Sequence, residues 1–475
     1  MKNSNFINGE WVEGDLNFLH SVINPASEEV ICEITWATSE QVAFAVQSAM
    51  TAYPGWAQTT KSQRVDLLLA LAEGLSNCEE ELGRIISSEL GSPIDQAIDE
   101  QVRGGILELK TIASALNSLE LSHAFDANNP SQHILHEPIG VAALITPWNW
   151  PLAQVTLKVG AALAAGCTTV LKPSEISPLT AIKLAEVIAD IGAPKGVFNL
   201  IQGNGATVGQ NLVQNQNVDI ISFTGSTKAG RSISQIAAEK TKRVVLELGG
   251  KSPTIIFSDA DLKAAARRAV HGCFHNTGQN CNAPTRLLVE ASVYEEVLGY
   301  LEQAAKEVKI DFPDRSGDHL GPVISQGQML RVQSYISDAI DEGANLFFGG
   351  IGRPDGFEKG WFVRPTIFTA VAENMAIWRE EVFGPVLAVM SFDDEADALE
   401  KANNTEFGLA AFIESNNQER CRRVSQRIRS GMIHINGASL ADGMPFGGMK
   451  QSGNGREGGV AGIREFLEVK AVAGW

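Results

Sequence analysis

The chain lacks any long uninterrupted hydrophobic run. Its most continuous apolar stretch, residues 159–171, is broken by Gly166, Thr168 and Thr169, whereas a helix that crosses a bilayer needs about 20 apolar residues. The first residues, MKNSNFINGEWVEG, contain no apolar segment typical of a secretory signal. The sequence therefore predicts no membrane partner, and we expect a cytoplasmic protein.

Positive charge is also scarce. Lys and Arg total 38 against 56 Asp and Glu, which gives a formal net charge of −18. Binding to DNA, RNA or anionic lipid depends on clustered Lys and Arg. We therefore expect no nucleic-acid partner.

Cysteine is rare and irregularly spaced. The six cysteines are Cys32, Cys78, Cys167, Cys273, Cys281 and Cys421. Since no CxxC pair occurs, the pattern is typical of reduced cytosolic thiols rather than of a disulfide framework. His271 and His275 could share one helix face, but no third ligand has suitable spacing. We expect core or interface histidines there, and no metal.

With 475 residues, the chain is long enough for two or three domains. Its first third has helical patterns, including a capping box at Thr38 and Gln41. From about residue 134, short β-branched runs alternate with helical patterns, one of them expected to begin with a Ser177 cap and Pro178. A second series follows Pro253. Such alternation predicts an α/β fold with mostly parallel sheets and a join near residues 249–250. The polar segment 123–132 is expected to be an arm or a hairpin.

Two motifs at predicted strand ends could hold a phosphate and a ribose. In FTGSTKAG (223–230), Gly225 lets the backbone approach a ligand and Ser226 can cap the following helix. In LKPSE (171–175), Lys172 and Glu175 could meet ribose hydroxyls. An ordinary capped turn and solvent-facing charges are the alternatives. A third segment, GNGATVG (203–209), has the wrong spacing for a dinucleotide motif, and we expect a turn.

Three further segments carry groups suited to catalysis. TPWNWP (146–151) holds Asn149, an uncharged donor that could stabilise an oxyanion; a rigid aromatic turn is the alternative. LELGGKSP (246–253) puts Glu247 in an apolar strand, where a carboxylate is unfavourable unless it is used, for instance as a general base. NTGQNCNAPTR (276–286) sets Cys281 between Asn280 and Asn282, which favours a reactive thiolate over a buried hydrophobe.

These motifs also form an ordered set. TPWNWP, KPSE, FTGS, ELGGKSP, GQNC, EEVFGP and PFGGMKQSGNGRE follow one another along the chain, between FINGEW and EFLEVKAVAG. The sequence thus resembles the NAD(P)-dependent aldehyde dehydrogenase superfamily, of the non-acylating, hydrolytic type, over nearly its whole length. The resemblance implies NAD-dependent oxidation of an aldehyde to a carboxylic acid, with NADP less favoured because of Glu175.

The resemblance also implies roles for individual residues. Cys281 would attack the aldehyde to give a thiohemiacetal and then a thioester, with the oxyanion held by Asn149 and the Cys281 N–H. Glu247 would activate the hydrolytic water, and Lys158 with Glu457 would relay protons. The implied cofactor contacts are Thr146, Trp148, Lys172, Glu175, Gly225, Ser226, Glu381 and Phe383. The residues expected near the substrate are Trp150, Ala153, Gln154, Leu157, Asn280, Asn282 and Phe446. Small and amide side chains in this set would suit a polar aldehyde in a roomy tunnel.

By the same resemblance, the fold would have three parts. Residues 1–118 and 140–249 would form a Rossmann-like NAD-binding domain, and residues 250–445 an α/β catalytic domain. Residues 119–139 and 460–475 would form a β oligomerisation arm, because an edge strand near the end of the chain needs a cover. We expect a homodimer or a homotetramer.

Three alternatives stay open. Acyl transfer to coenzyme A would keep the fold, although its catalysts typically lack a glutamate at the position of Glu247. A non-catalytic protein would not need Cys281, Asn149 and Glu247 together. A thiol esterase would use the same cysteine without NAD.

Overall fold

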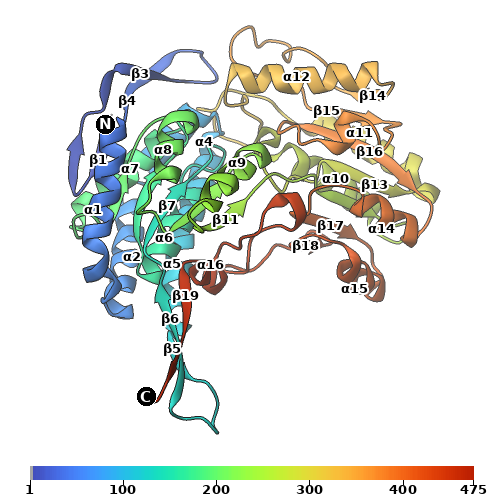
Figure 1. The fold of residues 1–475 in the computed structure, drawn as a ribbon. Helices are drawn as coiled ribbons and strands as arrows, with labels where there is room; N and C mark the ends of the chain where they lie inside the picture. Colours follow the sequence, from blue (N-terminus) through green and yellow to red (C-terminus); the bar gives the residue numbers. More distant parts are fainter. Residues whose placement is uncertain (1–3) are drawn as a thin grey trace.

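The computed structural model describes residues 4–475 and is built around two seven-stranded sheets (Figure 1). The first sheet has the order β11-β10-β7-β8-β9-β1-β2. Its strands are β1 (Asn5–Ile7), β2 (Glu10–Val12), β7 (Val141–Ile145), β8 (Thr168–Lys172), β9 (Phe198–Leu200), β10 (Ile220–Thr224) and β11 (Arg243–Glu247). Only β1 and β2 run antiparallel to their neighbours. The predicted α/β class is confirmed.

The second sheet has the order β14-β15-β16-β13-β12-β17-β18, and only its edge strand β14 is antiparallel. Its strands are β12 (Pro253–Ile256), β13 (Arg286–Glu290), β14 (Asn345–Phe348), β15 (Thr366–Thr369), β16 (Val386–Phe392), β17 (Ala410–Glu414) and β18 (Met432–Ile435). The inner strands are buried on both faces, as continuous apolar strands covered by helices should be.

Helices cover both sheets and bury their apolar stripes against them (Figure 1). Those that precede the second sheet are α1 (Ser39–Ala57), α2 (Lys61–Ser76), α3 (Glu79–Leu90), α4 (Ile94–Gln96), α5 (Arg103–Ser118), α6 (Ala153–Ala165), α7 (Leu179–Asp190), α8 (Gln210–Gln214) and α9 (Thr227–Ala238). The later ones are α10 (Leu262–Phe274), α11 (Tyr294–Glu307), α12 (Gln326–Asp341), α13 (Ala376–Arg379), α14 (Glu395–Asn403), α15 (Gln418–Arg427) and α16 (Gly459–Glu465). Between residues 4 and 475, none of the helices is long and apolar enough to traverse a bilayer.

One predicted helix cap is confirmed and another is wrong. Thr38 and Gln41 form the expected capping box at the start of α1. Ser177 does not cap α7; its hydroxyl instead donates to the carbonyl of Trp148. The α7 N-terminus is satisfied by the buried carboxylate of Glu89, which accepts hydrogen bonds from the backbone N–H groups of residues 179 and 180. A charged acceptor from α3 therefore takes the place of the local hydroxyl.

The strand order creates a crevice at the carboxyl edge of the first sheet. From β7 the chain adds β8 and β9 on one side, whereas β10 and β11 lie on the other side. The order thus reverses between β7 and β10, and ligands of open parallel sheets bind outside such a switch point. Residues 248–252 then lead from the carboxyl end of β11 to the amino end of β12, and so connect the two sheets.

A three-stranded antiparallel sheet projects from the body, at the bottom of Figure 1. It consists of β5 (Ser122–Ala124), β6 (Gln132–Pro138) and β19 (Leu467–Ala473), so the segment 123–132 is a hairpin, as expected. Residues 459–465 form α16 and pack against α5 and α6, and the terminal strand starts only after them. Near the other end of the molecule, β3 (Asp15–Ile23) pairs with β4 (Val30–Trp36).

Candidate active site

Cys281 lies on a tightly constrained loop before β13. Asn276, Thr277 and Gly278 have consecutive positive φ values of 52°, 55° and 71°. A Cβ at residue 278 would approach the carbonyl carbon of Gly384 to 2.1 Å, so only glycine fits there. Cys281 is partly exposed and packs, like Phe446, against the small cluster of Leu409, Ala410 and Met432. It is therefore accessible, unlike the fully buried cysteines 167 and 273.

The surroundings of Cys281 favour the protonated thiol over the thiolate. Burial raises the pKa of the thiol, and the neighbouring carboxylates Glu381, Glu247 and Glu457 add to this effect. A hydrogen bond with the Asn282 N–H acts in the opposite direction. The thiolate is the nucleophilic form, so this thiol needs a proton acceptor before it can react.

Asn149 is fixed against the same loop from the other sheet. Its side chain is 3% exposed, and its Nδ2 donates to the carbonyl of Gln279 at 2.9 Å. In return, Asn276 Nδ2 donates to the carbonyl of Asn149 at 3.0 Å. Two reciprocal hydrogen bonds thus join the turn after β7 to the cysteine loop and aim an amide donor beside it.

Glu247 ends β11 as a buried carboxylate without a hydrogen bond. It is 2% exposed, and neither carboxylate oxygen has a partner among the described residues. A Cβ at Gly447 would come within 2.6 Å of Glu247 Oε1, so glycine leaves room for this carboxylate. Burial raises the pKa of Glu247 well above its usual range, and the charge of Glu457 adds to this. A carboxylate whose pKa is raised in this way is a stronger base than an ordinary one and is suited to accept a proton.

Lys158 and Glu457 form a buried ion pair near Glu247. Lys158 Nζ contacts the Glu457 carboxylate and donates to Ser222 Oγ at 3.1 Å. The charges of both residues act on the pKa of Glu247. The structure thus gathers three predicted residues, from β11, α6 and the segment before α16, in one cluster.

The predicted cofactor residues gather around the switch point. Ser226 caps α9, accepting from the Ala229 N–H at 3.3 Å, and the N–H of Gly225 donates to the carbonyl of Glu247 at 3.1 Å. Nearby, the hydroxyls of Thr146 and Thr224 are buried without a partner in the described chain. A capped helix terminus and two unpaired hydroxyls at one crevice fit a dinucleotide.

Lys172 and Glu175 lie next to each other at the end of β8. Lys172 Nζ is 3.6 Å from Glu175 Oε2 and donates to the carbonyl of Pro173. Burial lowers the pKa of Lys172, whereas the charge of Glu175 raises it. The Glu175 side chain is 31% exposed, so its carboxylate can still accept from a ligand hydroxyl.

Glu381 and Phe383 lie on the loop before β16, in the second sheet's half of the molecule, and contact residues beside the crevice. Glu381 Oε1 accepts from the Gly250 N–H at 3.1 Å, and burial raises the pKa of Glu381 to about 7. The rings of Phe383 and Trp148 meet edge to face with centroids 5.3 Å apart. The loop before β16 therefore closes over the turn after β7.

The predicted substrate residues differ in how closely they approach the cysteine loop. Trp150 Nε1 donates to Asn280 Oδ1 at 2.7 Å. Gln154 is buried, with its Oε1 unpartnered in the described structure. The other members are partly exposed: Ala153, Leu157, Asn282 and Phe446.

The contact between His275 and Glu100 was not predicted from the sequence, and of the two environments expected for His271 and His275, core or interface, the core is wrong. His271 is exposed and His275 is half-buried. The His275 ring stacks on Trp150 with centroids 6.0 Å apart, and its Nε2 lies 2.7 Å from Glu100 Oε2. The closeness of His275 to Cys281 in sequence was one available signal, whereas nothing local pointed to Glu100.

Comparison with known proteins identifies the fold. The model of the aldehyde dehydrogenase family matches residues 11–472. A 3-succinoylsemialdehyde-pyridine dehydrogenase from Pseudomonas sp. is 46% identical over 99% of this chain and 98% of its own. The crystal structure of an aldehyde dehydrogenase from Bartonella henselae is 43% identical, with a TM-score of 0.98, over 100% of this chain and 99% of that one.

A third relative was crystallised with ligands. It is a mutant of aldehyde dehydrogenase C from Pseudomonas syringae in complex with NAD+ and octanal. It is 41% identical, with a TM-score of 0.97, over 99% of this chain and 96% of that one. The resemblance seen in the ordered motifs is confirmed: this chain belongs to the aldehyde dehydrogenase family, whose members are oxidoreductases acting on aldehydes.

Proposed function

We propose that this protein oxidises an aldehyde to a carboxylic acid with NAD+, through a covalent intermediate on Cys281. The observation that carries the proposal is the meeting of three groups at one crevice: an accessible thiol, the Asn149 amide and the unpartnered Glu247 carboxylate. The NAD+ complex of the Pseudomonas syringae relative supports the choice of cofactor.

In the proposed mechanism, Glu247 accepts the proton of Cys281, whose own surroundings do not favour the thiolate. Sγ then attacks the aldehyde carbon, and the oxyanion accepts hydrogen bonds from Asn149 Nδ2 and the Cys281 N–H. When bound, NAD+ supplies the acceptor for the hydride that leaves this carbon. Once Glu247 has passed the thiol proton on, it takes a proton from the water that attacks the resulting thioester; the acid leaves, and Glu247 returns this second proton to the Cys281 thiolate.

The Lys158–Glu457 pair completes the proposed proton path. Glu247 must lose the thiol proton before it can accept one from water, and its burial keeps bulk water away. The ion pair lies close enough for both charges to act on the pKa of Glu247. We propose that the Lys158–Glu457 pair carries that proton out of the site.

Spectrophotometry tests the proposed function. NAD+ reduction is followed at 340 nm with aliphatic, aromatic, hydroxy and semialdehyde substrates, and then with NADP+ instead. We expect turnover with NAD+ and formation of the carboxylic acid. A protein that binds NAD+ but oxidises none of these aldehydes would contradict the proposal, as would hydrolysis of esters without aldehyde oxidation.

Cofactor preference should depend on Glu175. Its carboxylate is placed to accept ribose hydroxyls and to repel a 2′-phosphate. In Glu175→Gln we expect the ratio of kcat/KM for NAD+ over NADP+ to fall about tenfold or more, because hydrogen bonds to charged groups contribute about 1.5–3 kcal/mol. Asp190→Asn, an exposed site on α7, is the control. An unchanged ratio in Glu175→Gln would remove Glu175 from the cofactor site.

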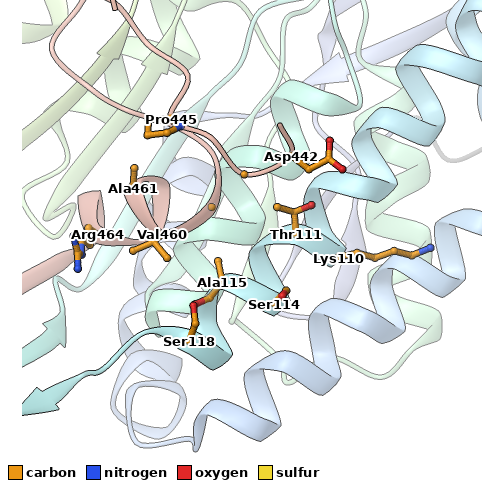
Figure 2. Close-up of a pocket in the computed structure, with 12 residues that line it drawn as sticks. Lys110, Thr111, Ser114, Ala115, Ser118, Asp442, Pro445, Val460, Ala461 and Arg464 are labelled. Atoms are coloured by element: carbon orange, nitrogen blue, oxygen red, sulfur yellow. The ribbon is translucent and has the colours of Figure 1, made fainter. Parts of the chain in front are cut away.

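We further propose that the projecting three-stranded sheet joins subunits into a homodimer or homotetramer. β19 is an edge strand of that sheet and carries Val469 at 66% exposure. A cavity of about 750 Å³ beside it (Figure 2) is lined by α5, the loop around Asp442 and α16. Exposed edge strands are prone to pair with another chain. Part of that second chain could occupy this cavity.

Val469→Asp should therefore weaken assembly. A charge on the exposed face of β19 would have to be desolvated in a subunit contact. Light scattering after size exclusion should give a lower mass than for the wild type, with Lys470→Gln as the control. A monomeric wild type, or an unchanged mass in Val469→Asp, would contradict the arm's proposed role.

We also propose a cytoplasmic location, because all six cysteines are free.

A further inference from the structure

A second cavity, of about 570 Å³, lies behind the cysteine loop. It is formed by α4 and the turn that follows it, by the end of α10, and by residues 308–320. The side chains that give it its chemistry are Gln96, Glu100, His271, His275 and His319. Three of the eight histidines of the chain thus line one cavity.

A relay of hydrogen bonds connects this cavity to the residue next to the nucleophile. The indole N–H of Trp150 can only donate, so the oxygen of the Asn280 amide must face it. The Asn280 Nδ2 group then faces His275, lying 3.3 Å from Nδ1 and donating to the His275 carbonyl at 3.0 Å. His275 Nε2 in turn lies 2.7 Å from Glu100 Oε2 and 3.0 Å from Gln96 Nε2.

The cavity wall is both acidic and aromatic. Burial opposes ionisation of Glu100, but its contacts with His275 and Gln96 outweigh this and lower the pKa of Glu100. The Glu100 side chain is 47% exposed, so a ligand can reach it. The rings of His271 and His275, with centroids 5.7 Å apart and planes tilted by 35°, give an aromatic wall beside it. Other acids outnumber bases around the rim: Asp95, Asp99, Glu307 and Asp318 against Arg267 and Lys309.

We propose that this cavity receives the far end of the aldehyde substrate, and that Glu100 and His275 select a flat, weakly basic nitrogen heterocycle there. This inference rests on the proposed aldehyde oxidation. A carboxylate favours the protonated form of a basic ring nitrogen and accepts its hydrogen. The imidazole rings pack against the plane of the heterocycle. A far end that is itself a carboxylate is repelled by Glu100.

The test compares a pyridyl and a phenyl aldehyde of equal length and shape, with a carboxylate-bearing aldehyde as the third substrate. We use 3-(pyridin-3-yl)propanal, 3-phenylpropanal and 3-(4-carboxyphenyl)propanal, and measure kcat/KM with NAD+. For the wild type we expect the pyridyl substrate to exceed the phenyl one by about tenfold or more, typical of a hydrogen bond to a charged group, and the carboxyphenyl substrate to be the poorest.

Two variants test whether Glu100 and His275 cause the preference for the pyridyl aldehyde. Glu100→Gln should reduce the pyridyl-to-phenyl ratio at least about fivefold. His275→Phe, which keeps a ring against Trp150 but removes the contact with Glu100, should act in the same direction. Glu295→Gln, an exposed position on α11 outside the cavity, is the control and should leave the ratio unchanged. Equal use of the two aldehydes by the wild type, or the same ratio in Glu100→Gln, would overturn the inference while aldehyde oxidation stands.

Calorimetry separates the two proposals. Cys281→Ala without cofactor is titrated with the pyridyl and phenyl aldehydes, alone and combined with Glu100→Gln. Tighter binding of the pyridyl aldehyde that is lost with Glu100→Gln supports the subsite, even if no aldehyde is oxidised and the proposed function fails. Equal affinities for the two aldehydes would overturn the subsite.

Discussion

Replacing Cys281 with alanine is expected to lower kcat/KM for aldehyde oxidation by about 10⁴-fold or more. Loss of a catalytic nucleophile removes the covalent route altogether and leaves only binding and oxyanion stabilisation. The change is small in volume and falls on a partly exposed side chain, so the fold should persist. Reduction of NAD+ at 340 nm with concentrated enzyme measures the residual rate, and thermal melting checks the fold.

A matched variant and a labelling experiment accompany this measurement. Cys78→Ala alters another partly exposed thiol, at the start of α3, and should keep full activity. Iodoacetamide should modify Cys281 in preference to the buried cysteines 167 and 273 and block turnover. Because burial and nearby carboxylates raise the pKa of Cys281, its alkylation should accelerate as pH rises. If Cys281→Ala kept more than about one hundredth of the activity, the proposed nucleophile would be wrong.

Much of the fold could be predicted because its signals are local. The capping box of Thr38 and Gln41 lies within four residues, and alternating strands and helices specify a parallel sheet wherever they occur. The cap of α7 could not be predicted. Glu89 comes from another helix, about 90 positions earlier, and only packing brings its carboxylate to that helix terminus.

The candidate site likewise contains residues that a local signal predicts and residues that only folding brings together. Glu247 was recognisable because a carboxylate in an apolar strand needs a reason to be buried, and the structure leaves both its oxygens unpartnered. Glu100 had no such signal, since it follows α4 in an ordinary polar helical segment. Its meeting with His275 joins residues 175 positions apart, and this contact exists only after folding.

Replacing Glu247 with glutamine should separate the two halves of the reaction. Without a general base the thioester accumulates, so one equivalent of NADH should form before a steady rate about 10²–10⁴-fold below that of the wild type. Stopped-flow absorbance at 340 nm resolves the two phases, and mass spectrometry of quenched enzyme should find the acyl group on Cys281. Because Glu247 also accepts the proton of Cys281 in the proposed mechanism, this burst should be slower than the first turnover of the wild type.

The pH dependence of turnover is a second, independent test of Glu247 as the base. Burial, reinforced by Glu457, raises its pKa, so the basic form accumulates only at higher pH than for an ordinary carboxylate. Wild-type turnover should therefore rise with pH through that raised pKa, and Glu247→Gln should lose this rise. Glu108→Gln is the control, because burial and the charge of Glu457 also raise the pKa of Glu108, to about 7, yet we assign it no proton transfer. A burst in Glu108→Gln, or none in Glu247→Gln with turnover intact, would show that the hydrolytic base lies elsewhere.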